Sequence, residues 1–138
     1  MMDVFEGIRT LLAVRRYLDR PVPEPVIRRI LEAGRLTASA MNLQPWHFIV
    51  VQDQETLRRL GALARSGPYI AEAPLAIVVA VERTGYAVSD ASRAIHSMLL
   101  TAWSEGVGSN WVGFGSLEKV NALLVIPATL DVLAILPF

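Results

Sequence analysis

The chain has 138 residues, enough for a single domain with its own hydrophobic core. Its basic and acidic residues balance at 13 each, so its charge gives no reason to expect a nucleic-acid partner or an anionic membrane surface. Without cysteine, the chain has no disulfides, thiolate metal sites or cysteine nucleophiles. Hydrophobic residues make up 53% and charged residues only 19%, and this apolar surplus predicts an obligate oligomer interface.

Neither a membrane span nor a signal peptide is expected. The longest apolar run, residues 73–81, contains a proline and is far shorter than the roughly 20 residues that a spanning helix needs. The first residues lack the basic start and apolar core of a signal peptide. We therefore expect a cytoplasmic protein.

The first half of the chain predicts three helices and a strand. Apolar residues at helical spacing predict helices over 4–12 and from Pro25 to about residue 35. A proline-stiffened connection, 19–23, lies between them. A run of β-forming residues predicts a strand over 47–52, and Asp53 is a good N-cap for the helix that follows.

The second half predicts a buried strand and one long helix. The Ile/Val/Ala run at 74–81 is typical of a central strand that is buried on both faces. Ser89 or Asp90 is expected to cap the long helix, which Gly106 ends. A short strand over 109–114, a helix capped by Ser116 and a strand over 132–138 complete the list. Strands interleaved with helices give an α/β or α+β layered domain.

Residues 38–51 are the most informative stretch. Ser39, Asn42 and Gln44 lie in a turn just before a strand, where side-chain amides and free backbone N–H groups can grip a planar polar ligand. Asn42 and Gln44 each offer a donor and an acceptor. The alternative is an ordinary helix-to-strand connection with a buried Trp46.

The sequence offers little acid–base or nucleophilic chemistry of its own. The two histidines, His47 and His96, are 49 positions apart and neither has a partner at metal-binding spacing. Neither a nucleophile-elbow nor a phosphate-loop motif is present. Hydrolysis is disfavoured, and we expect a cofactor to carry the chemistry. We assign no catalytic residue and no metal ligand.

Two further segments could hold such a cofactor. The guanidinium groups of Arg15 and Arg16 match phosphate oxygens, although adjacent arginines after a helix are commonly solvated charges. Trp111, Val112 and Gly113 combine an aromatic wall with a glycine that allows close backbone approach, although simple core packing explains them equally well.

These segments together resemble the nitroreductase family of flavin enzymes. Residues 38–48 match its Pro-Ser-x-x-Asn-x-Gln-Pro-Trp-x-Phe signature except for Ala38 in place of the first proline. The matches continue in the family's order. They are Arg15-Arg16-Tyr17, Pro21-Val22-Pro23-Glu24, the helix at Asp90 to Glu105 and the glycine-rich segment Gly106 to Gly113.

The resemblance implies an α+β fold with a mostly antiparallel central sheet flanked by helices. It also implies an obligate homodimer that binds FMN at its interface. Arg15 would take the phosphate, the Ser39–Asn42 turn would touch the flavin from its own or the partner subunit, Gln44 would brace the turn, and Val112 and Gly113 would border the ring. The implied cofactor-binding residues are Ala13, Arg15, Arg16, Ser39, Ala40, Asn42, Gln44, Trp111, Val112 and Gly113.

The activity implied is ping-pong transfer of hydride from NADH or NADPH, through flavin N5, to a small electron-poor acceptor such as a nitroaromatic or a quinone. Other reactions on the same fold, namely dehalogenation, enone reduction and deazaflavin-linked chemistry, stay open. So does a flavin-binding dimer without turnover.

Two departures from the family pattern bear on FMN affinity. Leu11-Leu12-Ala13 stands where family members commonly have Arg-Arg-Ser or Arg-His-Ser, which removes a cationic phosphate partner and a hydroxyl donor. Family members also usually continue past the final strand into a basic segment, which we expect this single domain, residues 1–138, to lack. Both departures predict weaker FMN binding.

Overall fold

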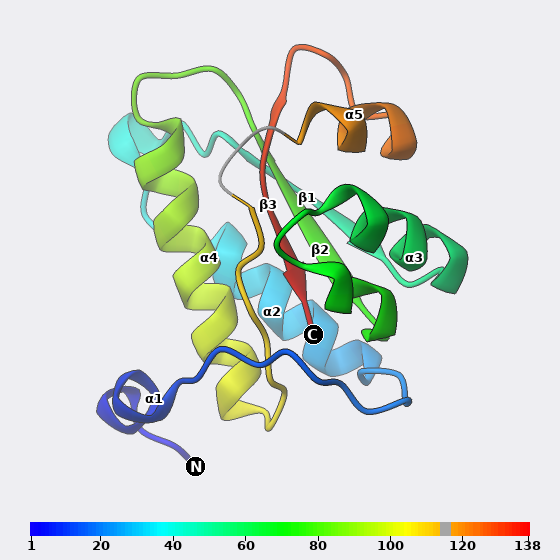
Figure 1. The fold of residues 1–138 in the computed structure, drawn as a ribbon. Helices are drawn as coiled ribbons and strands as arrows, with labels where there is room; N and C mark the ends of the chain where they lie inside the picture. Colours follow the sequence, from blue (N-terminus) through cyan, green and yellow to red (C-terminus); the bar gives the residue numbers. More distant parts are fainter. Residues whose placement is uncertain (114–116) are drawn as a thin grey trace.

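The computed structural model describes residues 1–113 and 117–138, which form an α+β domain (Figure 1). In the described residues the α-helices are α1 (Val4–Thr10), α2 (Glu24–Arg35), α3 (Gln54–Leu63), α4 (Ala87–Ser104) and α5 (Glu118–Leu124). The strands are β1 (Trp46–Val51), β2 (Ala76–Val81) and β3 (Asp131–Pro137), and two short 3-10 turns are η1 (Ala40–Asn42) and η2 (Pro68–Glu72). The predicted fold class is confirmed.

The sheet has the order β1-β2-β3, and both pairings are antiparallel. All six residues of β2 are buried, as the continuous apolar run predicted. A register shift between Val79 and Ala80 marks a bulge where β2 meets β3. The bulge places Leu133 and Ala134 against the same face, so that β3 does not alternate strictly.

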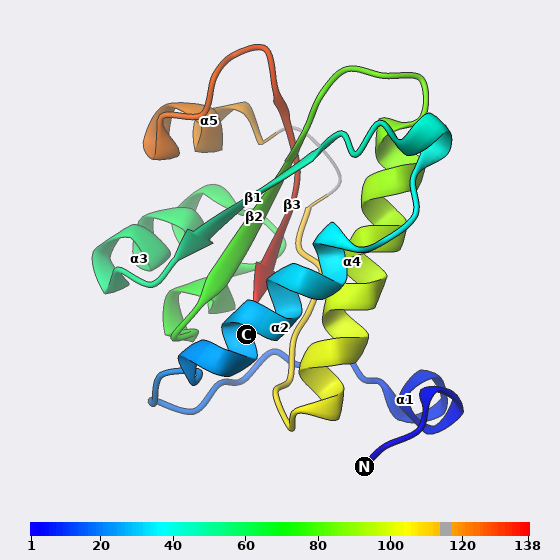
Figure 2. The same ribbon diagram turned by 180° about the vertical axis from the view of Figure 1, so that it is seen from behind.

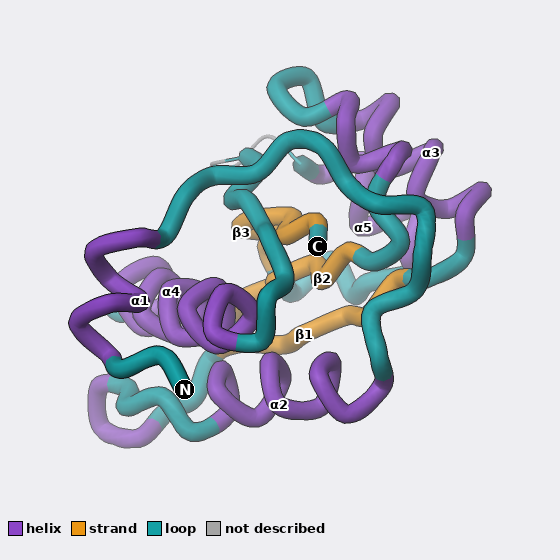
Figure 3. Tube along the Cα trace, turned by 90° about the horizontal axis from the view of Figure 1, so that it is seen from below, coloured by secondary structure: helices purple, strands orange, loops and turns teal. Residues whose placement is uncertain are grey.

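Helices cover both faces of this sheet (Figure 3). On one face, Leu75, Ile77 and Val79 pack in a core with residues of α2 and α4. On the other, Ala76, Val78 and Ala80 pack with residues of α3, η2 and α5. Successive side chains of a strand point to opposite faces, so every residue of β2 must be apolar when both faces are covered. An antiparallel strand therefore carries the pattern usually found in parallel sheets.

Several predicted helix ends are confirmed. The Asp53 carboxylate accepts a hydrogen bond from the backbone N–H of Thr56 at 3.0 Å and caps α3. Pro25 lies in the first turn of α2, where its missing N–H leaves no bond unmade. Beyond α4, Gly106 adopts a φ of 77°, the left-handed conformation that commonly ends a helix.

The predicted start of α4 is wrong. The helix begins at Ala87 with Tyr86 as its N-cap, and no side chain caps it. Ser89 lies inside the first turn, as does Asp90, whose carboxylate instead accepts a hydrogen bond from the backbone N–H of Ala40. The Asp90 carboxylate therefore binds a segment distant in sequence and does not cap its own helix in the way that the local sequence predicts.

The predicted strand over 109–114 forms only in part. Within 109–113 the structure has two isolated bridges, from Ser109 to Ala13 and from Val112 to Ile135. Phe114 and the predicted cap Ser116 lie outside the described residues. The helix that follows begins at Glu118, and its N-cap is Leu117.

One predicted apolar stripe is not buried by its own chain. Helix α1 ends at Thr10, two residues earlier than expected, and its Val4 and Ile8 side chains are exposed by 78% and 55%. Phe5 and Leu12 beside them are exposed by 70% and 66%. This apolar surface, which we call the α1 face, lies at the outer edge of the molecule (Figure 1).

Packing of α2 on α4 and β1 predicts a specific weak point. A Cβ on Gly34 would lie 2.7 Å from Met98 Sδ and 2.8 Å from Phe48 Cζ. We expect Gly34→Val to lower the free energy of unfolding by about 1–3 kcal/mol, measured by urea denaturation, because overpacking displaces both side chains. Gly85→Val is the control, since nothing lies within 4 Å of that position. Equal losses in the two variants would contradict this packing.

Candidate functional site

The N-terminal segment is held at the C-terminal end of α4. The indole N–H of Trp103 donates to the Thr10 hydroxyl at 2.9 Å. The backbone N–H of Val14 then donates to the Ser109 carbonyl at 2.9 Å, and Ala13 forms a parallel bridge with Ser109. Ala13, Arg15 and Arg16 thus lie near the segment that carries Trp111, Val112 and Gly113.

Arginines on this segment differ from most others in the chain. Arg15, Arg16 and Arg20 are exposed, and among the described residues none of them forms an ion pair. Seven other arginines do pair with a carboxylate: Arg9, Arg28, Arg29, Arg35, Arg58, Arg83 and Arg93. Residues 15–20 carry these three guanidinium groups and one carboxylate, Asp19, and so keep a net positive charge that suits an anion.

An aromatic pair supports residues 15–20, which we call the basic segment. The rings of Tyr17 and Tyr69 stack with centroids 6.5 Å apart. Tyr17 donates its hydroxyl proton to the Val14 carbonyl at 2.6 Å, and Asn110 donates from Nδ2 to the Tyr69 hydroxyl at 2.6 Å. These contacts join the basic segment, η2 and the strand-like segment 109–113.

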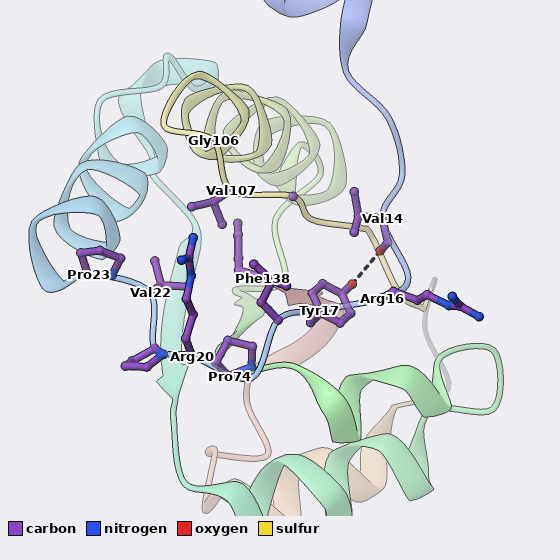
Figure 4. Close-up of a pocket in the computed structure, with 13 residues that line it drawn as sticks. Val14, Arg16, Tyr17, Arg20, Val22, Pro23, Pro74, Gly106, Val107 and Phe138 are labelled. Carbon is purple, nitrogen blue, oxygen red and sulfur yellow. Dashed lines mark hydrogen bonds between the residues drawn. The ribbon is translucent and has the colours of Figure 1, made fainter.

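A cavity of about 160 Å³ opens beside Tyr17 (Figure 4). Its lining includes Val22, Val107 and Phe138, and Arg20 runs along one side, whereas Arg16 points away from its centre. Ligand pockets usually measure about 300–1,000 Å³, so this cavity is too small to enclose a whole flavin. A cofactor on this side of the molecule would therefore meet exposed residues rather than this cavity.

The turn 39–44 has an unusual backbone. Met41, Asn42 and Gln44 have φ values of 51°, 54° and 49°, in the left-handed region that non-glycine residues rarely adopt. The Ser39 hydroxyl accepts a hydrogen bond from the backbone N–H of Gln44 at 3.0 Å, and Gln44 Nε2 donates to Asn42 Oδ1 at 2.6 Å. Ala40 donates its backbone N–H to Asp90. Asn42 and Gln44 are exposed.

Trp111, Val112 and Gly113 form a compact local structure. Trp111 donates from its indole nitrogen to the Gly113 carbonyl at 2.6 Å, and Gly113 has a φ of 87°. Val112 is 2% exposed, and its backbone N–H and C=O both bond Ile135. Val112 therefore anchors its neighbours Trp111 and Gly113, which are only partly buried.

Within one chain the turn and the basic segment lie at opposite ends of α4. Asp90 holds the turn near the start of the helix, and Trp103 in its last turn bonds Thr10, five residues before Arg15. At about 1.5 Å per residue, the 13 positions between Asp90 and Trp103 span roughly 20 Å. Figure 2 shows the turquoise turn beside the upper end of α4 and the dark blue segment crossing its lower end.

Sequence reasoning missed three contributors to this arrangement. The sequence predicts Arg20 only as part of a proline-stiffened connection, although its spacing from Arg16 is visible. It predicts Asp90 as a helix cap, because no local signal distinguishes a capping carboxylate from a buried one that bonds a distant segment. The stacking of Tyr69 on Tyr17 joins residues 52 positions apart, which periodicity cannot detect.

In the part of the chain that the structure describes, no group of three or more His, Cys, Asp or Glu side chains is placed to hold a metal ion.

No helix among residues 1–113 and 117–138 is both long and apolar enough to cross a membrane.

Burial raises the pKa of Tyr17 well above its ordinary value of 10.0, and neighbouring Tyr69 adds to the increase while Arg15 opposes it. The unfolded chain therefore releases this proton first, so the stabilisation is complete below about pH 10 and declines as the pH rises further. We expect Tyr17→Phe to flatten the fall in unfolding free energy between pH 9 and 11, measured by urea denaturation. Tyr86→Phe, at an exposed tyrosine, should keep the wild-type slope, and identical slopes in all three proteins would contradict the burial of Tyr17.

Comparison with known proteins places this geometry in a family. The model of the nitroreductase family matches residues 9–82 and 65–138. A protein of Methanothermobacter thermautotrophicus, provisionally named NADH dehydrogenase/NAD(P)H nitroreductase, is 37% identical over 145 aligned positions, covering 99% of this chain and 76% of that protein. The FMN reductase [NAD(P)H] of Bacillus subtilis is 32% identical over 75 positions, covering 54% of this chain and 30% of the relative.

Solved structures show the same relationship. The FMN-dependent nitroreductase of Clostridium difficile R20291 superimposes with a TM-score of 0.92 at 28% identity, covering 97% of this chain and 85% of that one. Family model, sequence relatives and fold agree over nearly the whole chain. The chain belongs to the nitroreductase family.

Proposed function

We propose that this protein is an FMN-dependent oxidoreductase that takes electrons from NADH or NADPH. Bound FMN would supply the redox chemistry, accepting hydride at N5 and passing electrons to a small electron-poor acceptor such as a nitroaromatic or a quinone. The observation that carries the proposal is the group of exposed arginines, Arg15, Arg16 and Arg20, which form no ion pair with any described residue, in a chain of this family that also presents an exposed amide turn.

The basic segment fits the phosphate end of FMN. Arg15 and Arg16 are exposed and unpaired, and guanidinium binds phosphate oxygens through two parallel hydrogen bonds. Leu11, Leu12 and Ala13, just before this segment, carry no charge. Arg20 is the nearby cation that can replace part of the missing positive charge. Ala13, bridged to Ser109, sets the path of the backbone beside the phosphate.

The turn fits the polar edge of the flavin ring. Because Gln44 Nε2 bonds Asn42 Oδ1, the groups left to a ligand are the Asn42 amide donor and the Gln44 carbonyl acceptor. The polar edge of the flavin ring alternates C=O and N–H groups, so it requires a donor and an acceptor side by side on the protein. Ser39 and Ala40 support this pattern through the backbone of the turn.

The two halves of this site come together in a homodimer. The phosphate and ring of FMN are joined by a short ribityl chain, whereas Asp90, which holds the turn, and Trp103, near the basic segment, lie roughly 20 Å apart along α4. A second copy would bring its own turn to the basic segment. The exposed α1 face supplies apolar surface for such an interface, because contiguous apolar surface of this kind marks association sites.

The chain's own residues bind and orient, and none is needed as an acid or a base. Trp111 and Gly113 border the ring, and Val112 fixes them to β3. Five residues, 82–86, connect β2 to α4, so this connection is too short for a long lid. We therefore expect an open pocket that accepts several small oxidants.

Removing Arg15 should weaken FMN binding. We expect Arg15→Met to raise the FMN dissociation constant by roughly 10- to 100-fold, since a hydrogen bond to a charged group contributes about 1.5–3 kcal/mol. Quenching of FMN fluorescence measures it. Arg59→Met is the matched control, because Arg59 is also exposed and unpaired among the described residues but lies on α3.

Anaerobic addition of NADH or NADPH to the FMN-loaded protein then tests turnover. Bleaching of the flavin absorbance, reversed by a nitroaromatic or a quinone, is the expected result. Protein that never takes up FMN would overturn the proposed function. FMN uptake without bleaching would instead support a flavin-binding dimer without turnover.

Mixing two variants tests the shared site. Arg15→Met damages the basic segment, and Asn42→Gly removes the turn amide while still allowing the positive φ. If each site takes its arginine from one subunit and its turn from the other, unfolding and refolding the two variants together creates mixed dimers with one intact site. We expect the mixture to regain tight FMN binding that neither variant has alone. No recovery in mixed dimers would place the whole site within one chain.

A further inference from the structure

Asp90 is a buried carboxylate that bonds a segment 50 residues away. It is fully buried, and its Oδ1 accepts a hydrogen bond from the backbone N–H of Ala40 at 3.0 Å. Arg93, one turn along α4, pairs with the same oxygen. Since α4 begins at Ala87 without a side-chain cap, this carboxylate does not serve the helix end.

The second oxygen of Asp90 is also informative. Oδ2 is buried and accepts no hydrogen bond from residues 1–113 or 117–138. A buried ionisable group with an unsatisfied oxygen is costly, and an uncharged residue would suit a purely apolar core better. We therefore expect this carboxylate to have a role outside the apolar core.

That role concerns the turn 39–44, to which Asp90 is hydrogen-bonded. Met41, Asn42 and Gln44 all have positive φ, so the turn is strained and needs external support to persist. Inside the turn, the support consists of hydrogen bonds among Ser39, Asn42 and Gln44 and short-range backbone bonds. Among the hydrogen bonds of the described residues, the bond to Asp90 ties the turn to a rigid element of the core.

We propose that Asp90 is a positioning residue for the flavin-binding turn: it fixes Ala40 to the first turn of α4 and so presets the direction of the Asn42 and Gln44 amides. Arg93, whose side chain is 51% exposed, neutralises the carboxylate from the solvent side. No charged residue lies within 38–44, so the carboxylate meets only a backbone dipole on that side. The inference rests on the proposed FMN site.

Removing the carboxylate tests this role. We expect Asp90→Ala to raise the FMN dissociation constant roughly tenfold, because the turn must then be ordered at the expense of binding. It should also shift the visible absorbance and circular dichroism of bound FMN and speed hydrogen exchange at the Ala40 amide in the FMN-free protein. Asp90→Asn keeps an acceptor oxygen and should restore most of the affinity.

Asp53→Ala is the matched control. Asp53 also accepts a backbone N–H at 3.0 Å, from Thr56, but it caps α3 away from the turn. It should lower stability without changing the flavin spectrum or the Ala40 exchange rate. A general loss of stability would affect both variants alike, whereas loss of positioning affects only the Asp90 variant.

A second variant, Ala40→Pro, tests the same hydrogen bond if Asp90→Ala does not fold. Ala40→Pro removes the donor N–H, and the extended conformation of Ser39 (ψ 157°) is compatible with a following proline. It should weaken FMN binding to a similar extent. Wild-type affinity and spectrum in both variants would overturn the inference. Wild-type protein that does not bind FMN would overturn the proposed function instead, and Ala40 exchange would still report whether Asp90 holds the turn.

Discussion

Burial of β2 on both faces is the constraint on which the rest of the structure depends. Every residue of this strand lies in a core, with alternate side chains facing α2 and α4 or α3 and α5. A sheet whose central strand is apolar on both faces is stable in water only when both faces are covered. The two helical layers therefore follow from one apolar strand, and both cores meet at its backbone.

Helix α4 connects this core to the candidate site. Its buried side packs on the sheet, and its two ends lie beside the two groups of residues that we propose to bind FMN. A rigid helix keeps those groups apart within one chain. The same rigidity would set a constant spacing for the symmetric partner that we propose. The exposed α1 face lies close to the helix end that carries the basic segment.

The candidate site combines a strained turn with arginines that form no ion pair with any described residue. The positive-φ turn and the arginines without carboxylate partners each cost stability in an isolated chain. Both costs are reasonable where a ligand is to be bound, because a prearranged turn and free cations lower the ordering and desolvation that binding would otherwise require. Among the described residues, seven of the nine other arginines pair with a carboxylate, five of them at helical spacing.

The sequence by itself determined the helix stripes, the doubly buried strand, the Asp53 cap and the amide turn, because each depends on residues close together along the chain. It also determined the family, through motifs in a fixed order. Only the tertiary structure decided that Asp90 serves Ala40 rather than its own helix, that residues 109–113 form bridges rather than a strand, and that the α1 stripe is exposed. Each of these depends on contacts between segments distant in sequence, where one side chain has several possible partners and packing selects among them.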